Sequence, residues 1–296
     1  MPNSILTPNV IAKESLRVLR NNAVMANLVH RDFSKEFVAG VGDTITVRKP
    51  ATFEAKEFNE NNGIEIQDAT EAGVPVVMDK HLDVSFAVTS KQLTMDIDDF
   101  SKQFLEPAMQ AFADKVDKYL IGLEADVTNR LTHASGPLTT AEIVKARKFL
   151  VDAGVPLTER RFVYDSAAEA DLLQTDLFVN ASAVGDNGTA LREASLGRKY
   201  GLDFYVDQNI TKTTNETGPN YTPDILFHKN AFALVTRPLA LPQGAAKSSI
   251  VNYDGFGLRV VFSYDSNTKK DIISIDMLCG VKTLDKNLAA VIADGR

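Results

Sequence analysis

The residues of this sequence that could do chemistry are few and widely spaced. The one cysteine, Cys279, lies in an apolar run, and the four histidines are His30, His81, His133 and His228. None belongs to a His-Glu-x-x-His or paired-cysteine pattern of the kind that holds zinc. We expect Cys279 to be a buried apolar residue, and the histidines to be surface or turn residues rather than metal ligands.

Two weaker chemical signals stay open. Asp96, Asp98 and Asp99 could hold a divalent cation, although an acidic cluster that caps the following helix explains them more simply. A strand at 161–164 precedes a capped helix, whose N-terminus could bind an anion. The sequence contains no Gly-x-Gly-x-x-Gly, no Gly-Lys and no Gly-x-Ser-x-Gly pattern, so it predicts no cofactor, no metal and no catalytic site.

Composition excludes several classes of partner. The chain has 296 residues, a net charge of −7 and a pI near 5.2, so the whole molecule has no basic footprint for nucleic acid. No apolar stretch approaches the roughly 18 residues of a membrane helix. Residues 1–10 have neither a basic nor an apolar segment of the secretory type, which predicts that the protein is made and kept in the cytoplasm.

One long helix, predicted over residues 101–127, organises the chain. Apolar side chains recur on it at steps of three and four residues: Phe104, Ala108, Phe112, Val116, Tyr119 and Leu123. Pro107 must either kink this helix or stand in its first turn. The helix is either the core helix of one domain or a spine that joins two lobes.

A long hairpin is predicted before that helix. Alternating patterns predict strands at 41–50 and 82–88, and an apolar run predicts a strand at 74–78. Between the first two lies a polar, acidic excursion with a turn signal that ends at Gly63. A lone hairpin cannot hold itself together in water, so it needs a surface to lie on. The alternative is a disordered surface loop.

The remaining pattern is α+β. A capping box at Thr139 and Glu142 opens a helix that ends before Gly154, and Asp165 caps a short helix. Strands are predicted at 161–164, 201–207, 225–227, 231–236, 258–264, 271–278 and 280–284. One mixed lobe would span 135–250, and a second would join the long helix to the C-terminal strands.

The order of these parts resembles the tailed-phage major capsid (coat) proteins of the P-twenty-two coat type, a branch of the Hong Kong 97-type fold. Nearly the whole chain contributes, through several segments and their order rather than through a catalytic signature. The segments are 3–8, 21–25, 28–32, 41–47, 231–238, 258–264 and 278–281.

The resemblance implies five parts. They are an N-terminal arm (1–38), an E-loop hairpin (39–95), the spine helix of the P-domain (96–134), an A-domain (135–250) and the C-terminal sheet of the P-domain (251–296). The large inserted domain of the best-known member has no room between 135 and 257.

The resemblance also implies a function, which is structural rather than enzymatic. The subunits would assemble through pentamers and hexamers into an icosahedral head that encloses double-stranded DNA, with a scaffolding protein and a portal as further partners. The place would be the virion capsid, assembled in the bacterial cytoplasm, with no membrane partner. Alternatives are an encapsulin-like shell around a protein cargo and an α+β enzyme whose site is unrecognised.

Opposite charges on the arm and the hairpin suggest a subunit interface. The basic arm residues are Lys13, Arg17, Arg20 and Arg31, and the acidic hairpin residues are Glu54, Glu57, Glu60 and Glu65. Each exposed ion pair would contribute less than ~1 kcal/mol, but complementary charge can set the register between subunits. We therefore hypothesise that these residues meet between neighbouring subunits.

Overall fold

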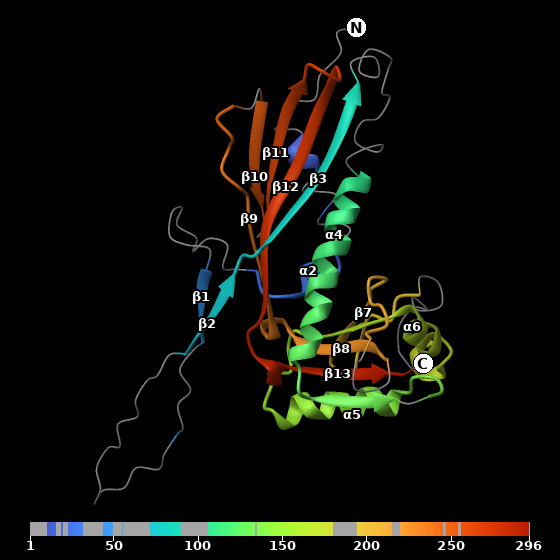
Figure 1. Ribbon diagram of the computed structural model, residues 1–296. Coiled ribbons are helices and arrows are strands. Elements are labelled where there is room, and N and C mark those ends of the chain that lie inside the picture. Colours follow the sequence, from blue (N-terminus) through green and yellow to red (C-terminus); the bar gives the residue numbers. More distant parts are fainter. Residues whose placement is uncertain are drawn as a thin grey trace, which may run out of the picture.

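The computed structural model describes residues 11–15, 19, 23–31, 44–49, 55, 72–89, 106–133, 135–179, 194–214, 220–244, 247–253 and 256–295. Figure 1 shows a long antiparallel sheet at one end and a second, mixed sheet at the other. The helix α4 runs beside the long sheet and reaches the mixed sheet, and the strand β12 also extends along the molecule. The α+β class predicted from the sequence is confirmed.

The predicted long helix is α4, Glu106–Ile121, which continues as a 3-10 helix, η3, Gly122–Asp126. Pro107 lies in the first described turn of α4, as one of the two predicted alternatives allows. The change from α to 3-10 geometry falls at Gly122, a weak helix former. Residues 101–105 of the prediction lie outside the described residues.

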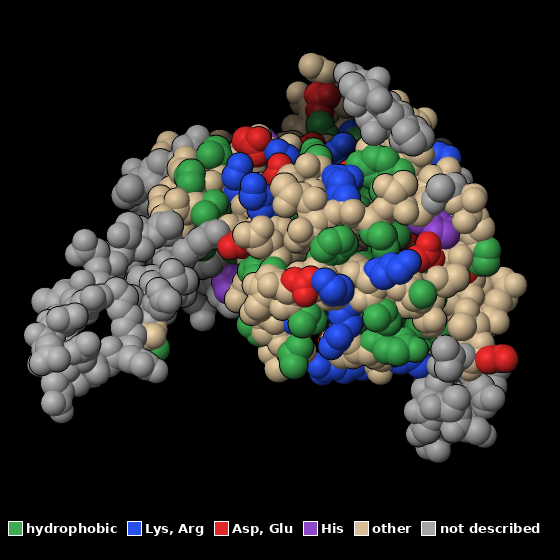
Figure 2. Space-filling model, turned by 90° about the horizontal axis from the view of Figure 1, so that it is seen from below, with side chains coloured by type: hydrophobic (Ala, Val, Ile, Leu, Met, Phe, Trp, Pro, Cys, Tyr) green, Lys and Arg blue, Asp and Glu red, His purple; other side chains and the backbone are tan. Residues whose placement is uncertain are grey.

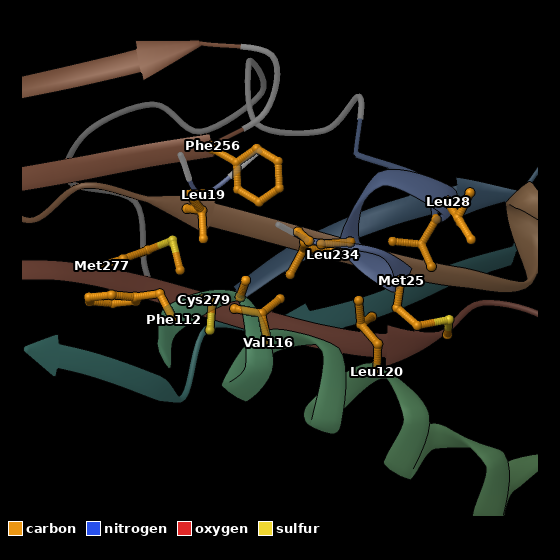
Figure 3. Packing of buried hydrophobic residues seen from close by; sticks show 14 of the residues in the cluster. Leu19, Met25, Leu28, Phe112, Val116, Leu120, Leu234, Phe256, Met277 and Cys279 are labelled. Atoms are coloured by element: carbon orange, nitrogen blue, oxygen red, sulfur yellow. The ribbon is translucent and has the colours of Figure 1, made fainter. Parts of the chain in front are cut away.

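The buried face of α4 follows the predicted stripe at Ala108, Phe112 and Val116, and it continues through Leu120. The predicted Tyr119 and Leu123 are only partly buried. The buried side chains pack against strands of the long sheet and against the N-terminal segment that contains α2, Met25–Leu28. Figure 3 shows Leu19, Met25 and Leu28 on one side of this core and the α4 side chains on the other.

The long sheet has the strand order β10-β11-β12-β3, and β9 pairs with the other half of β12. All these pairings are antiparallel. The strands are β3 (Lys80–Thr89), β9 (Phe232–Arg237), β10 (Lys247–Tyr253), β11 (Phe256–Asp265) and β12 (Lys270–Thr283).

β12 corrects the prediction of separate strands at 271–278 and 280–284, because it runs through Gly280 without a break. A Cβ atom at Gly280 would lie 2.3 Å from the carbonyl oxygen of Val77. The glycine therefore makes room for a close backbone approach, which is a common reason for glycine inside a strand.

The mixed sheet has the order β4-β13-β8-β5-β7-β6 among the described strands. Two of its pairings, β4 with β13 and β5 with β7, are parallel. The strands are β4 (Arg130–His133), β5 (Arg160–Tyr164), β6 (Arg198–Lys199), β7 (Leu202–Val206), β8 (Thr222–His228) and β13 (Ala289–Asp294).

Helices accompany the mixed sheet: α5 (Thr140–Asp152), α6 (Ser166–Leu173) and α7 (Asp176–Val179). The predicted capping box of α5 is confirmed, with Thr139 and Glu142 in reciprocal contact, and Gly154 after its end has φ +68°. Asp165 caps α6 as predicted, accepting the N–H of Ala168. Because α5 buries Ile143, Ala146 and Leu150 against Phe162, Leu226 and Ile292, the mixed sheet has its own core.

The predicted hairpin base is also confirmed. β1 (Thr44–Lys49) and β2 (Ala72–Val77) pair antiparallel from Thr44↔Val77 to Lys49↔Ala72. In Figure 1 these two strands stand to one side of the long sheet. Of the acidic excursion that joins them, only Ala55 lies within the described residues.

The sheets divide the chain differently from the predicted residue boundaries. β13 pairs with β8 of the 135–250 segment and, on its other side, with β4, although β4 and β13 fall within 96–134 and 251–296. Conversely, β9 falls within 135–250 and β10 crosses its end, but both belong to the long sheet. The physical reason lies in β13, whose Ala289, Ala290, Val291 and Ile292 are fully buried between β4 and β8.

Candidate functional site

The described part of the N-terminal segment is fastened to α4 by one buried carboxylate. The Val24 N–H donates to Asp117 Oδ2 at 2.8 Å, and the Ala26 N–H donates to Oδ1 at 2.9 Å. α2 has no side-chain cap from its own N-cap residue. Asp117 therefore satisfies N–H groups at the start of α2 from a helix about ninety residues later in the chain.

Asp117 has a second acidic neighbour, Asp207, and both side chains are fully buried. Burial raises the pKa of Asp117 to about 7, and the charge of Asp207 adds to the rise, whereas the backbone N–H donors oppose it. Burial also raises the pKa of Asp207, which the donors of Asn209 oppose. The attachment of the N-terminal segment is consequently sensitive to protonation near neutral pH. The sequence carried a signal for it, an acid inside the apolar stripe of α4, which our sequence analysis missed.

Beyond α2 the N-terminal segment runs beside β9. The His30 N–H donates to the Phe232 carbonyl at 3.0 Å, and the Leu234 N–H donates to the His30 carbonyl at 3.0 Å. The His30 Nδ1 lies 3.0 Å from Asn230 Oδ1. These contacts extend the long sheet by a short parallel bridge and fix residues 23–31 to the body of the subunit.

Of the eight residues hypothesised for the subunit interface, the structure describes Lys13 and Arg31. The Arg31 guanidinium lies over the ring of Phe256 in the same chain, 4.8 Å from the ring centroid. Lys13, on the helical residues 11–15, is exposed. Arg17, Arg20, Glu54, Glu57, Glu60 and Glu65 lie outside the described residues, so the charge pairing stays a prediction.

The hairpin base contacts the body through a small cluster of its own. Val47, Val76 and Met78 pack with Ala233, Val235 and Leu284, while Val77, on the opposite face of β2, is 43% exposed. Within the described residues, β1 and β2 pair only with each other, and β3 and β10 end the long sheet. These strands present backbone edges that can accept a further strand.

Two histidines correct the prediction that all four are surface or turn residues, because His133 and His228 are buried. His133 contacts the Glu142 carboxylate through Nδ1 and the Gly136 carbonyl through Nε2, the latter at 3.0 Å. Burial alone would lower the pKa of His133, but these two acceptors outweigh it and raise the pKa. A ring with an acceptor at each nitrogen is best satisfied as the cation, which donates from both.

The described residues give no support to the chemical signals that the sequence left open. No group of three or more His, Cys, Asp or Glu side chains that could hold a metal occurs in the described part of the chain. Burial raises the pKa of the Cys279 thiol to about 12, so this cysteine is a poor nucleophile. At the start of α6, where the sequence left an anion site open, the Asp165 carboxylate already accepts an N–H. Asp96, Asp98 and Asp99 lie outside the described residues, and none of the described helices is long and apolar enough to cross a membrane.

Solved structures resemble the whole arrangement. A chain from Mycobacterium phage Che8 matches with a TM-score of 0.64 and 18% identity, over 91% of this chain and 90% of that one. The capsid of cyanophage P-SCSP1u matches with a TM-score of 0.56 and 14% identity, over 86% of this chain and 84% of that one. The chain has the Hong Kong 97-type fold of phage capsid proteins.

The Hong Kong 97-type fold predicted from the sequence is thus confirmed, and no large inserted domain interrupts the described residues. The P-twenty-two branch is a finer assignment that these similarities do not test. A virus-like particle from Pyrococcus furiosus also matches, with a TM-score of 0.53 and 11% identity, over 96% of this chain and 98% of that one. No protein-family model and no curated protein matches the sequence.

Proposed function

We propose that this protein is the major capsid protein of a phage-type head, a structural subunit without enzymatic activity. Copies assemble through pentamers and hexamers into an icosahedral shell that encloses double-stranded DNA. The observation that carries the proposal is the β1–β2 hairpin. It combines a two-stranded sheet, an exposed apolar side chain at Val77 and backbone edges that no other described strand pairs with. A pair of strands gains its stability from surfaces to lie on. The body of its own subunit covers one face of this pair, through Val47 and Val76, and a neighbouring subunit covers the other face.

The fold supports the proposal, because the capsid of cyanophage P-SCSP1u has the same architecture over most of both chains. The net charge of −7 fits a shell that does not bind DNA by electrostatic attraction. DNA then enters by a separate packaging step through a portal, and a scaffolding protein directs assembly, in the cytoplasm of a bacterial host.

The test is negative-stain microscopy with light scattering on the protein expressed alone. Closed shells, tubes or spirals are expected. A monodisperse monomer or dimer that stays inert after concentration, and after a candidate scaffolding protein is added, contradicts the proposal and reopens the search for an enzyme site.

A shell around a protein cargo is the second candidate, because the virus-like particle from Pyrococcus furiosus covers this chain almost completely. The contents of purified native particles separate the two functions. Double-stranded DNA supports the phage-type head, and a single co-purifying protein inside the shell supports the cargo function.

We further propose that the basic arm and the acidic hairpin set the register between subunits. Reversing Arg17 and Arg20 to Glu should lower the yield of closed shells. Adding Glu54→Lys and Glu57→Lys to that variant should restore part of the yield, since the charges are again complementary. Unchanged assembly of the Arg17→Glu, Arg20→Glu variant rejects the pairing without affecting the capsid proposal.

A further inference from the structure

Two arginines, one on α5 and one at the start of β5, each have a buried N–H group without a partner in the described chain. Arg160, at the start of β5, has only 1% of its surface exposed. Its Nε donates to the Pro156 carbonyl at 2.7 Å, and its Nη2 donates to the Val155 carbonyl. The loop after α5 therefore fixes this guanidinium, while its buried Nη1 has no partner in the described chain.

The second arginine, Arg147, extends from α5 toward the β6–β7 turn. A Cβ atom on Gly201 would lie 3.9 Å from Arg147 Nη2. Its Nε is also buried and has no hydrogen-bond partner in the described chain. Burial lowers the pKa of Arg160, and the positive charge of Arg147 lowers it further, because the two cations repel each other.

The carboxylates on the surrounding elements pair with other cations. These ion pairs are Lys148 with Asp152, Lys229 with Glu159 and Arg198 with Asp203. The neighbouring His228 is also surrounded by more positive than negative charge. Burial lowers its pKa, and Arg161, Arg160 and Lys229 lower it further, against only Glu159 in the other direction.

We propose that Arg147 and Arg160 bind an oxyanion, a carboxylate or a phosphate, where the second half of α5, the start of β5 and the β6–β7 turn meet. A buried guanidinium N–H without a partner is costly, and an oxyanion satisfies several such donors at once. Arginine is suited to this because its planar fork of donors matches two oxygens of one ligand. Figure 2 looks onto the molecule from the α5 side and shows Lys and Arg side chains gathered there among hydrophobic ones.

Inorganic phosphate is the probe, with the purified full-length chain and sodium chloride at equal ionic strength as the reference. At tenfold above its dissociation constant, phosphate should raise the unfolding temperature by about 3 °C. Arg147→Gln should abolish this rise, and because Arg147 is partly exposed it can be replaced without breaking the Arg160 contacts. Arg160→Lys should reduce the rise, since lysine keeps the charge but not the fork.

Lys145→Gln is the matched control, because it removes an exposed charge from the same helix and should keep the full response. Far-ultraviolet circular dichroism in chloride checks that Arg147→Gln is folded. An equal response to phosphate and chloride in the unmodified chain overturns the proposal, as does a full phosphate response in folded Arg147→Gln.

Sedimentation of the same proteins distinguishes the two sources of the oxyanion. If the ligand is a carboxylate of a second copy, phosphate weakens self-association of the unmodified chain but not of Arg147→Gln. If the ligand is a free anion, phosphate leaves self-association unchanged while still raising the unfolding temperature. Neither result depends on the capsid proposal, because both are measured on the chain itself.

Discussion

The mixed sheet and the β1–β2 hairpin differ in how their strands are covered and paired. In the mixed sheet, the central strands β13, β8 and β5 are almost entirely buried, and α5 closes one face. In the hairpin, two strands pair only with each other within the described residues, and Val77 is 43% exposed. The first region is specified by contacts within its own chain. The second has polar edges and an apolar residue that a neighbouring subunit would complete.

The largest expected effect is in the mixed sheet. Phe162 is fully buried, with its ring centroid 5.4 Å from that of Phe204 in an edge-to-face contact. Phe162→Ala should lower the free energy of unfolding of the free subunit by about 3–5 kcal/mol, because it leaves a cavity in a closed core. Chemical denaturation measures this. Tyr205→Ala, at a 38% exposed position of β7, should cost far less, and an equal loss would mean that this core is not closed.

Protonation should change the free energy of unfolding most at the junction between the N-terminal segment and α4. The pKa of Asp117 is raised from 3.8 to about 7, so between these values the folded state keeps a proton that the unfolded state has lost. The free energy of unfolding should therefore fall as pH rises through this window, by about 4 kcal/mol from this group.

Asp117→Asn removes that titration and should flatten the profile between pH 4 and pH 7. Its overall stability should also be lower, because an amide can accept only one of the two N–H bonds. Asp152→Asn, at an exposed position of α5, is the control and should keep the original slope. An unchanged slope in Asp117→Asn would contradict the assignment.

Adding one methyl group at Gly280 should disrupt the contact between the hairpin and the long sheet. Gly280→Ala places a Cβ 2.3 Å from the Val77 carbonyl oxygen, so backbone must shift, at an expected cost of about 2–3 kcal/mol. Gly122→Ala is matched to it, since a Cβ there meets no atom within 4 Å. We expect that control to be neutral or slightly stabilising. Equal denaturation midpoints for the two variants would rule out the close approach.

A smaller effect on the free energy of unfolding is expected from His133, at pH values above 6.5. Its pKa is raised above 6.5, so its contribution is complete below pH 6.5 and is lost as pH rises through the folded-state pKa. His133→Gln should remove about 1 kcal/mol at pH 6 and less at pH 9, as measured by urea unfolding. His81→Gln, at a largely exposed side chain, should leave that pH dependence as it was.

The smallest effect on the free subunit should come from the hairpin surface. Val77→Ser should change the free energy of unfolding by less than ~0.5 kcal/mol, because the side chain is exposed. It should nevertheless reduce the yield of particles at a given protein concentration. Val151→Ser, with 44% exposure on α5, is matched in chemistry but lies outside the hairpin. If both variants assemble equally well, Val77 is not part of an interface.

Sequence patterns predicted the elements whose signals are local. The capping box of Thr139 and Glu142 and the alternation in β1, β2 and β3 suffice because neighbours in sequence determine them. β13 was missed because a central strand buried on both sides shows no alternation. β4 was missed as well, and its partner β13 lies about 160 residues later in the chain.

Side chains whose role depends on partners far away in the sequence were harder still to predict. Asp117 caps α2 and lies near Asp207, and Arg147 and Arg160 come together only through the turn after α5. Gly280 looked like a strand break because its reason is the approach of β2, which the local sequence does not contain. The fold could thus be predicted from order and resemblance, while these contacts required the structure.

Hydrogen exchange on free subunits and on assembled particles tests the central comparison most directly. Amides of β5 and β8 should be strongly protected in both states. Amides of β1 and β2 should exchange readily in the free subunit and become protected only in the particle. Strong protection of β1 and β2 in the free subunit, or their continued exchange in the particle, would contradict the account that a neighbouring subunit completes the hairpin.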